Sequence, residues 1–343
     1  KPTKMGAMQR LDASDPGFAD AFDALVNDRR ESDSDVSADV AAIIARVKVE
    51  GDSALLDLTR RFDGFDLDEA GWSIGKDACA AAYEGLEHGL RSALDLAANR
   101  ITDFHVRQRP KSADWTDAAG VSLGYRWGAV EAAGIYVPGG RAAYPSSVLM
   151  NAIPAKVAGV DRLVMVTPTP NGTINPLVLA AAHLAGVDDI WRIGGAQAVA
   201  AMAYGTDKIA PVDVITGPGN AWVAEAKRQL YGRVGIDMVA GPSEILVVAD
   251  GDNDPDWIAA DLLSQAEHDP TSQSILMTDD AGFADRVAGA IERQLGELAT
   301  EDTARKSWES HGAIIILADL DEAPPLIDRL APEHLELAVA LPD

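Results

Sequence analysis

The chain has 343 residues, 54 of them acidic and 29 basic, so its formal net charge is −25. This charge argues against binding to a nucleic acid backbone or an anionic membrane surface, because both are themselves negative. One cysteine, Cys79, excludes an internal disulfide framework and fits a reducing compartment such as the cytoplasm. The length predicts two domains, and no apolar run approaches the ~18 residues of a membrane span.

Helical periodicity dominates the first third of the chain. It predicts a short arm ending in a helix at residues 18–26, followed by a polar linker at 27–34. Alternation over Ser122–Trp127 predicts a strand that leads inwards. His88 and His105 are interpreted as structural. Further amphipathic helices are predicted at residues 36–49, 53–62 and 77–104.

From about residue 130 the chain repeats a strand, a glycine-rich turn and a helix, which is typical of a parallel sheet with crossover helices. Ligands of such sheets bind beyond the carboxyl ends of the strands, where helix amides hold phosphate without a basic side chain. The strict G-x-G-x-x-G fingerprint is absent, so this pattern alone leaves nucleotide binding open. The strands are predicted at residues 132–137, 162–167, 189–193, 212–215 and 244–249.

A candidate metal site lies at the end of a predicted helix that starts with Asp254 as N-cap and Pro255 at its first position. Gln265 and His268 are three residues apart, so their side chains leave one face of the helix at a spacing that suits two ligands of one metal ion. The alternative is a structural histidine that the helix dipole favours at a C-terminus. Pro270 is expected to end the helix.

A candidate acid–base pair, Glu333 and His334, follows Pro332 in a predicted loop. Both side chains could reach one cleft as separate proton acceptors, or they form a solvated surface pair. His183 and His311 have no such context and are interpreted as structural. Before this pair, the chain resumes its alternation with strands predicted at 274–278 and 312–318 and helices at 281–298 and 321–330.

Seven motifs occur in order along the chain: Gly134–Gly140, Tyr144–Met150, Gly194–Ala198, Gly217–Ala221, Ala240–Glu244, Ser264–His268 and Pro332–Leu335. Together they resemble the histidinol dehydrogenase family, and the resemblance runs from Gly51 onwards. It implies oxidation of L-histidinol through L-histidinaldehyde to L-histidine with two NAD+, in the last steps of histidine biosynthesis. It also implies a homodimer with intertwined arms, in which the partner chain completes the active site. NAD would contact Tyr136, Gln197 and Asn220.

The same resemblance implies a zinc ion in each subunit, with Gln265 and His268 as ligands that also touch the substrate. Ser243 and His334 would be further substrate contacts. His334 suits the removal of the alcohol proton, because an imidazole ordinarily titrates near neutral pH. Glu333 would activate the water that adds to the aldehyde. The sequence leaves the choice among zinc, manganese and cobalt open.

The predicted fold is α/β, with two Rossmann-like domains, each an incomplete parallel sheet, and a helical N-terminal arm. The arm is residues 1–27, the NAD-binding domain is 136–242, and the metal and substrate domain combines 28–135 with 243–343. In the family, the remaining zinc ligands are an Asp and a His that lie nearer the C-terminus, as does a substrate-binding Glu. The motif that carries the Asp has no match in this sequence. We therefore expect the sequence to be truncated beyond Asp343.

Two alternatives remain at this point. One is a related zinc and NAD dehydrogenase that acts on another small polar alcohol or diol. The other is a binding protein that keeps the fold and lacks the metal, against which the presence of Gln265, His268, Glu333 and His334 counts.

Overall fold

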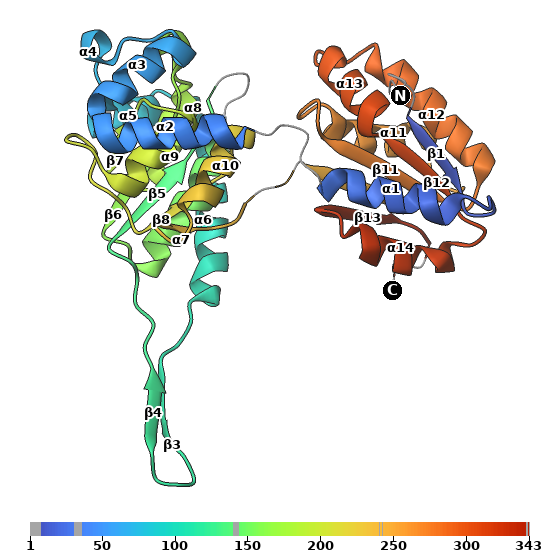
Figure 1. Ribbon diagram of the computed structural model, residues 1–343, viewed down its shortest axis with the longest axis horizontal. Coiled ribbons are helices and arrows are strands. Elements are labelled where there is room, and N and C mark those ends of the chain that lie inside the picture. The colour runs from blue at the N-terminus through green and yellow to red at the C-terminus, as the bar shows by residue number, and fades with distance from the viewer. Residues whose placement is uncertain are drawn as a thin grey trace. The chain divides into compact units, whose positions relative to one another are not determined.

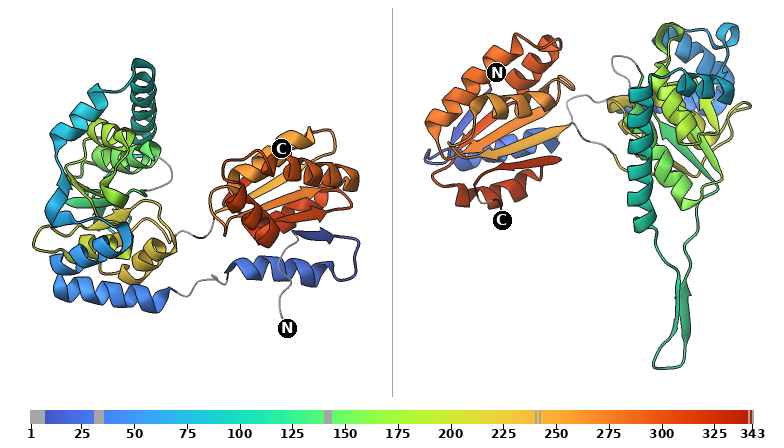
Figure 2. Two further views of the ribbon diagram at one scale, coloured as in Figure 1. Left: turned by 90° about the horizontal axis from the view of Figure 1, so that it is seen from above. Right: turned by 180° about the vertical axis from the view of Figure 1, so that it is seen from behind.

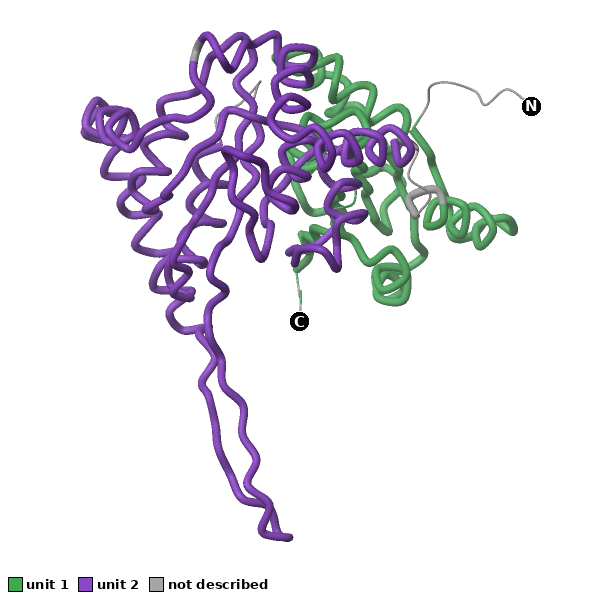
Figure 3. The backbone as a smooth tube through the Cα atoms, turned by 60° about the vertical axis from the view of Figure 1, so that its left-hand side comes forward, with its two compact units in different colours: residues 1–33, 241–343 green, residues 34–240 purple. Residues whose placement is uncertain are grey.

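The computed structural model describes residues 8–30, 36–139, 144–239, 241, 243–340 and 342. The chain divides into two compact units, coloured separately in Figure 3. Unit 1 comprises residues 1–33 and 241–343, and unit 2 comprises residues 34–240. Gly140, Ala240 and Pro242 of the motifs, and residues 31–34 of the predicted linker, lie outside the described residues.

Unit 2 is built on a mostly parallel sheet in the order β2-β7-β6-β5-β8-β9, in which only β2 pairs antiparallel. From β5 the chain moves outward to β6 and β7 and then crosses back to β8 on the other side of β5. The strand order therefore reverses between β5 and β8, which is where doubly wound folds bind their ligands. The strands are β2 (Ser73–Ile74), β5 (Ala132–Tyr136), β6 (Arg162–Val166), β7 (Asp189–Trp191), β8 (Val214–Thr216) and β9 (Gly235–Ile236).

Helices cover both faces of this sheet (Figure 1). Val164 and Val166 of β6 pack on one face while Leu163 and Met165 pack on the other, as strand geometry requires. One face holds α2 (Ser37–Glu50), α3 (Asp52–Asp63), α9 (Gly195–Tyr204) and α10 (Ala221–Leu230); the other holds α5 (Lys76–Glu84), α6 (His88–Gln108), α7 (Pro145–Ala158) and α8 (Pro176–Leu184). The short α4 (Leu67–Ala70) and η1 (Pro170–Gly172) complete the unit.

The predicted helix at 77–104 is two helices, α5 and α6. Gly85 ends α5, and its N–H donates to the Ala81 carbonyl at 2.9 Å. The apolar periodicity continues across this break, so it did not reveal the end of the first helix.

A hairpin of β3 (Ala113–Thr116) and β4 (Ser122–Tyr125) extends away from the body of unit 2 (Figures 1 and 2). The prediction of a strand leading inwards at 122–127 was wrong in this respect. Trp115 and Tyr125 are each 49% exposed, and their rings meet edge to face at 6.1 Å. Alternating apolar residues mark a strand with one apolar face, whether or not the rest of the chain covers that face.

Unit 1 contains a five-stranded parallel sheet in the order β1-β12-β11-β10-β13. Its strand order reverses between β10 and β13, as it does between β5 and β8 in unit 2. The strands are β1 (Gln9–Asp12), β10 (Glu244–Ala249), β11 (Gln273–Thr278), β12 (Ala313–Ile316) and β13 (His334–Ala338). One face packs against α11 (Pro255–Ala266), α12 (Ala281–Leu295) and α13 (Glu301–His311), and the other against α1 (Phe18–Arg30) and α14 (Ala323–Leu330), which follows η2 (Leu320–Glu322).

These two sheets confirm the predicted α/β fold, but the chain is divided differently from the prediction. The predicted N-terminal arm contributes β1 and α1 to unit 1, because β1 pairs with β12. Residues 34–135 belong with 136–240 and not with 243–343, because α2 and α3 pack on α9 and β5 pairs with β6 and β8. In the described part of the chain, no helix is both long and apolar enough to cross a membrane.

Candidate functional site

The carboxyl edge of the unit 2 sheet is formed by turns that pack unusually close together. A Cβ atom added to Gly139 or to Gly194 would overlap Pro168 in the turn after β6. Gly217, after β8, has φ +113°, and a Cβ there would overlap the carbonyl oxygen of Tyr136. Glycine is therefore required for these turns to pack so closely. They form the rim of the switch point between β5 and β8.

Tyr136 and Gln197 lie beneath this rim and are almost fully buried, at 4% and 3% exposed. Tyr136 ends β5, and its hydroxyl accepts a hydrogen bond from the Gly195 N–H at 3.0 Å. Burial raises the pKa of Tyr136 to about 12, the nearby charge of Asp63 raises it further, and the bond from Gly195 opposes the shift. The phenol is therefore protonated at neutral pH. The Gln197 side chain folds back towards Gly195, at the first turn of α9.

Asn220 is the exposed member of the predicted NAD-binding set. Its Oδ1 caps α10 by accepting hydrogen bonds from the N–H groups of Trp222 and Val223, both at 3.2 Å. Because Oδ1 serves the cap, Nδ2 is the group with which this side chain can donate to a ligand. The N-terminus of a helix also attracts anions, and a dinucleotide carries a pyrophosphate. This edge of unit 2 therefore suits a dinucleotide.

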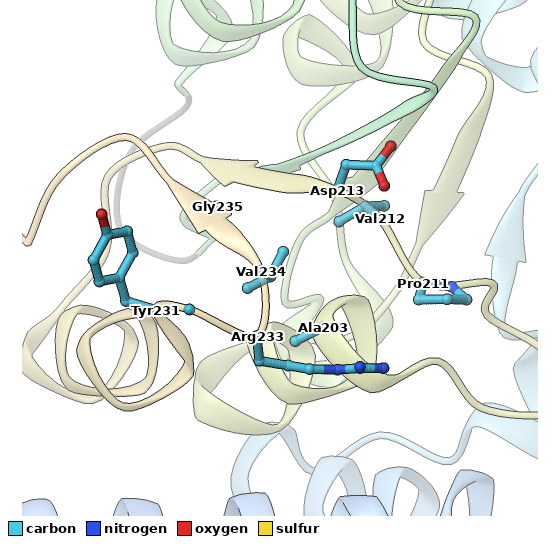
Figure 4. A pocket seen from close by; sticks show the side chains of 9 residues that line it. Ala203, Pro211, Val212, Asp213, Tyr231, Arg233, Val234 and Gly235 are labelled. Atoms are coloured by element: carbon cyan, nitrogen blue, oxygen red, sulfur yellow. The ribbon is translucent and has the colours of Figure 1, made fainter.

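A pocket of about 430 Å³ lies elsewhere in unit 2 (Figure 4). Its wall includes residues 211–213, which precede β8, and residues 231–234, which precede β9, so it lies at the amino edge of the parallel sheet. The Tyr231 and Arg233 side chains extend from it in different directions (Figure 4). It contains none of the predicted site residues. It is lined by Ala203, Pro211, Val212, Asp213, Tyr231, Gly232, Arg233, Val234 and Gly235.

The predicted metal, substrate and acid–base residues all belong to unit 1, at the amino edge of its sheet. Ser243 precedes β10, and its carbonyl accepts the Gln273 N–H at 2.9 Å. Glu333 precedes β13, and its Oε2 accepts the Glu244 N–H at 3.4 Å. His334 is the first residue of β13, beside Ile245 of β10. The prediction of a loop at Glu333 and His334 was therefore wrong for His334, because it pairs with β10 as the first residue of β13.

The end of α11 reaches the same edge, since α11 runs back from the end of β10 to the start of β11. Its start agrees with the prediction: Asp254 caps the helix by accepting the Asp256 N–H at 2.9 Å, and Pro255 follows. Gln265 is 7% exposed in the last turn, and His268 is exposed just beyond it. The His268 N–H donates to the Gln265 carbonyl at 3.2 Å.

The donor groups at this edge are of the kinds that bind a metal ion, but there are too few of them for a complete site. Gln265 offers an amide oxygen and His268 an imidazole nitrogen, whereas a zinc ion takes about four ligands. Among the described residues, no three His, Cys, Asp or Glu side chains are grouped so that they could hold a metal. The pair thus fits zinc as part of a ligand set that further groups must complete.

Glu333 and His334 are both exposed, with Oε1 and Nε2 3.9 Å apart. Two further carboxyl groups lie nearby, since Glu336 of β13 hydrogen-bonds to Asp261 of α11. Burial raises the pKa of Glu336, and the charge of Asp261 and this hydrogen bond raise it further. The cavity between β10, β11 and Pro332 measures only about 20 Å³. The described residues of unit 1 therefore present the acid–base groups on an open surface.

We expect Glu336→Gln to stabilise the protein at neutral pH and not in acid. A carboxyl group whose pKa is raised by folding contributes most below its ordinary pKa, and this contribution is lost as the pH rises through the folded value. Glutamine stays neutral and can still donate to Asp261. Urea unfolding at pH 7 should show a gain on the order of 1 kcal/mol, the size of one hydrogen bond. A gain of equal size at pH 4, or one matched by the exposed control Glu297→Gln, would contradict this explanation.

Comparison with known proteins identifies one family, and the match includes both units. A family model described as histidinol dehydrogenase matches residues 26–343. A histidinol dehydrogenase of Zymomonas mobilis is 64% identical over 334 residues, which are 97% of this chain and 78% of that protein. One from Rhodospirillum rubrum is 64% identical over 335 residues, 97% of this chain and 77% of that protein. The crystal structure of histidinol dehydrogenase from Elizabethkingia anophelis is 34% identical, covers 98% of this chain and 77% of its own, and superposes with a TM-score of 0.88.

Lys227 and Asp237, which contact the Gly217 turn in unit 2, were not predicted as site residues. The sequence contains one indication that Lys227 has a buried partner. Lys227 occupies the apolar stripe of α10, together with Val223, Ala226 and Leu230, at the spacing of a buried helix face. A lysine in that position indicates a buried partner. The sequence does not say which one.

Proposed function

The chain belongs to the histidinol dehydrogenase family, and from that premise we propose that it oxidises L-histidinol through L-histidinaldehyde to L-histidine with two NAD+ and a zinc ion. The observation that carries this proposal is the gathering of Gln265, His268, Glu333 and His334 at one edge of the unit 1 sheet. These residues lie up to 69 positions apart in the sequence, as their numbers show. A soluble cytoplasmic enzyme is the setting we propose for this reaction.

Gln265 and His268 are the ligands that this chain would contribute to zinc. The burial of Gln265 fixes its amide, while the exposed His268 can turn its ring towards the ion. Bound zinc would hold the amine and imidazole nitrogens of histidinol and so orient the carbinol carbon for hydride transfer. Ser243 would contact the substrate from the start of β10.

His334 and Glu333 are the proton acceptors in this proposal. In the first oxidation, His334 accepts the proton of the alcohol while a hydride leaves the carbinol carbon. Water must then add to the aldehyde before the second hydride can leave, and Glu333 accepts a proton from that water. Their exposure suits the exchange of protons with solvent, and a positioned base of this kind typically contributes about 10² to 10⁴ in rate.

Tyr136, Gln197 and Asn220 would form the NAD site at the carboxyl edge of unit 2. The chemistry that bound NAD+ supplies is the acceptance of one hydride in each oxidation. Asn220 is exposed and would contact the dinucleotide through Nδ2. Tyr136 and Gln197 are buried, so they would act mainly by shaping the first turn of α9 around Gly195.

A homodimer accounts for the exposed hairpin. Two-stranded hairpins are marginally stable in water by themselves. Here several large apolar side chains of the hairpin and its base are nevertheless exposed, as is the end of α6 that leads to it. We propose that a second copy of the chain covers them and adds groups to the open unit 1 site. The exposed residues are Phe104, Val106, Trp115, Val121, Leu123, Tyr125 and Trp127.

We expect Trp115→Ser with Tyr125→Ser to weaken the dimer without unfolding unit 2. Sedimentation at several protein concentrations should show dissociation at concentrations at least about tenfold above those for the unchanged protein, because buried aromatic residues dominate interface energies. The control is Trp257→Ser, which removes another exposed tryptophan, from α11. An unchanged dimer in the hairpin variant, or equal weakening in the control, would exclude the hairpin as the interface.

The reaction itself is tested by NADH formation with L-histidinol and with related small polar alcohols and diols, in the presence of zinc. We expect L-histidinol to be the best substrate by kcat/KM. Turnover of another alcohol without turnover of L-histidinol would replace the proposed substrate.

A further inference from the structure

The backbone N–H and carbonyl of Gly217 are held by the two members of one ion pair, in which the lysine is buried and the aspartate is partly exposed. The Lys227 Nζ donates to the Gly217 carbonyl at 3.0 Å, and the Gly217 N–H donates to Asp237 Oδ2 at 2.9 Å. Lys227 and Asp237 also form an ion pair with each other. Both polar groups of this residue are therefore fixed by side chains from α10 and from the end of β9.

Packing alone does not require a charge at the position of Lys227, so the placement of this lysine is informative. Lys227 is 3% exposed and lies on the apolar stripe of α10, where a leucine or methionine would fill the same space. A buried lysine in an ion pair is often no more stabilising than an apolar residue of similar volume, because its charge loses its hydration. What the pair supplies here, and apolar residues cannot, is a partner for each polar group of Gly217.

Gly217 occupies a position where a small shift would alter the candidate NAD site. It follows β8 at the switch point, and its Cα lies against the Tyr136 carbonyl. Asn220 begins α10 three residues later, and Lys227 lies two turns further along the same helix. The ion pair thus fixes the start of the 217–220 turn relative to the helix that ends it.

We propose that Lys227 and Asp237 are positioning residues for the dinucleotide, holding the 217–220 turn in its binding conformation before NAD+ arrives. This inference rests on the proposed function, because it takes NAD+ as the ligand of this edge. A turn held in place before binding loses less conformational freedom when the ligand binds, and affinity is higher for that reason. Loss of the ion pair should therefore weaken NAD+ binding and leave histidinol recognition, which we assign to unit 1, unchanged.

The test uses the full chain and measures NAD+ affinity by calorimetry without histidinol, so that it does not depend on turnover. Lys227→Met keeps the volume of the side chain and removes its charge. Since it leaves Asp237 unpaired, Lys227→Met with Asp237→Asn provides a second variant without an unpaired charge. Arg228→Met is the control, because Arg228 is on the same helix and exposed, and pairs with Glu225. Hydrogen exchange of residues 217–223 reports on the turn directly.

We expect both Lys227 variants to bind NAD+ at least about tenfold more weakly, the effect of losing one charge-assisted hydrogen bond. Hydrogen exchange in residues 217–223 should become faster, while KM for L-histidinol should stay within about twofold of the unchanged protein. In Arg228→Met, the NAD+ affinity, the exchange rates and KM should all stay within about twofold. A folded double variant that binds NAD+ as tightly as the unchanged protein would overturn the inference. An equal rise in KM for NAD+ and in KM for L-histidinol would also overturn it, because it would show that the substitution loosens the whole protein and not the 217–220 turn alone. Failure of the unchanged protein to bind NAD+ would overturn the proposed function itself.

Discussion

His268→Asn is expected to lose zinc and activity together. Asparagine cannot replace an imidazole nitrogen at the same reach, and Gln265 would remain as this chain's one proposed ligand at the end of α11. Even the loss of a group that only supports a metal ligand typically lowers metal affinity or activity by about 10- to 100-fold. We therefore expect kcat/KM for L-histidinol to fall by more than about 100-fold after removal of a ligand. Metal analysis of the dialysed protein, alongside initial rates, measures both effects.

A matched control separates this effect from the loss of any histidine. His88 is exposed at the start of α6 in unit 2, and His88→Asn should retain zinc and activity. If His268→Asn retained zinc at the level of the unchanged protein, His268 would not be a ligand, even if the activity were lost.

Glu333→Gln is expected to separate the two oxidations. Glutamine keeps the size of the side chain and can still accept the Glu244 N–H, but it cannot take a proton from water. The conversion of aldehyde to acid should slow by about 10²- to 10⁴-fold, the usual contribution of a general base. The conversion of alcohol to aldehyde should slow much less. Single-turnover measurements that start from histidinol and from histidinaldehyde give the two rates separately.

The comparison of half-reactions also tests the division of labour between Glu333 and His334. Glu322→Gln, on the exposed η2 turn, should change neither rate and serves as the control. Equal slowing of both oxidations in Glu333→Gln would remove the water-activating role from Glu333 and indicate a role common to both steps.

The strands β5 to β8 and β10 to β12 could be predicted from the sequence because each is a short apolar run closed by turn residues. The strands β1, β2, β9 and β13 were not predicted. The start of α11 was marked by Asp254 and Pro255, and the structure has both in the predicted positions. The division into units was not predictable in this way. Periodicity indicates that α2 and α3 have an apolar face, but not that α9 is what covers it. For the same reason, β1 could not be assigned to unit 1, since its partner β12 lies about 300 residues away.

The candidate residues of the site could be predicted from the sequence, but their arrangement in space could not. Proximity in sequence grouped Gln265 with His268 and Glu333 with His334, and the structure has both pairs at the amino edge of the unit 1 sheet. The arrangement that brings both pairs to the amino edge of one sheet depends on β13 pairing beside β10, which no local pattern indicates. Lys227 and Asp237 are ten residues apart and meet because β9 pairs with β8. Local chemistry is therefore readable from the sequence, whereas contacts made through sheet pairing are not.

The most direct test of the whole account is the number of NADH molecules formed for each L-histidinol consumed, measured with and without a chelator. We expect two NADH for each histidinol, lost when the metal is removed and restored by zinc. One NADH for each histidinol with release of the aldehyde, or turnover that the chelator does not affect, would contradict a zinc-dependent four-electron oxidation.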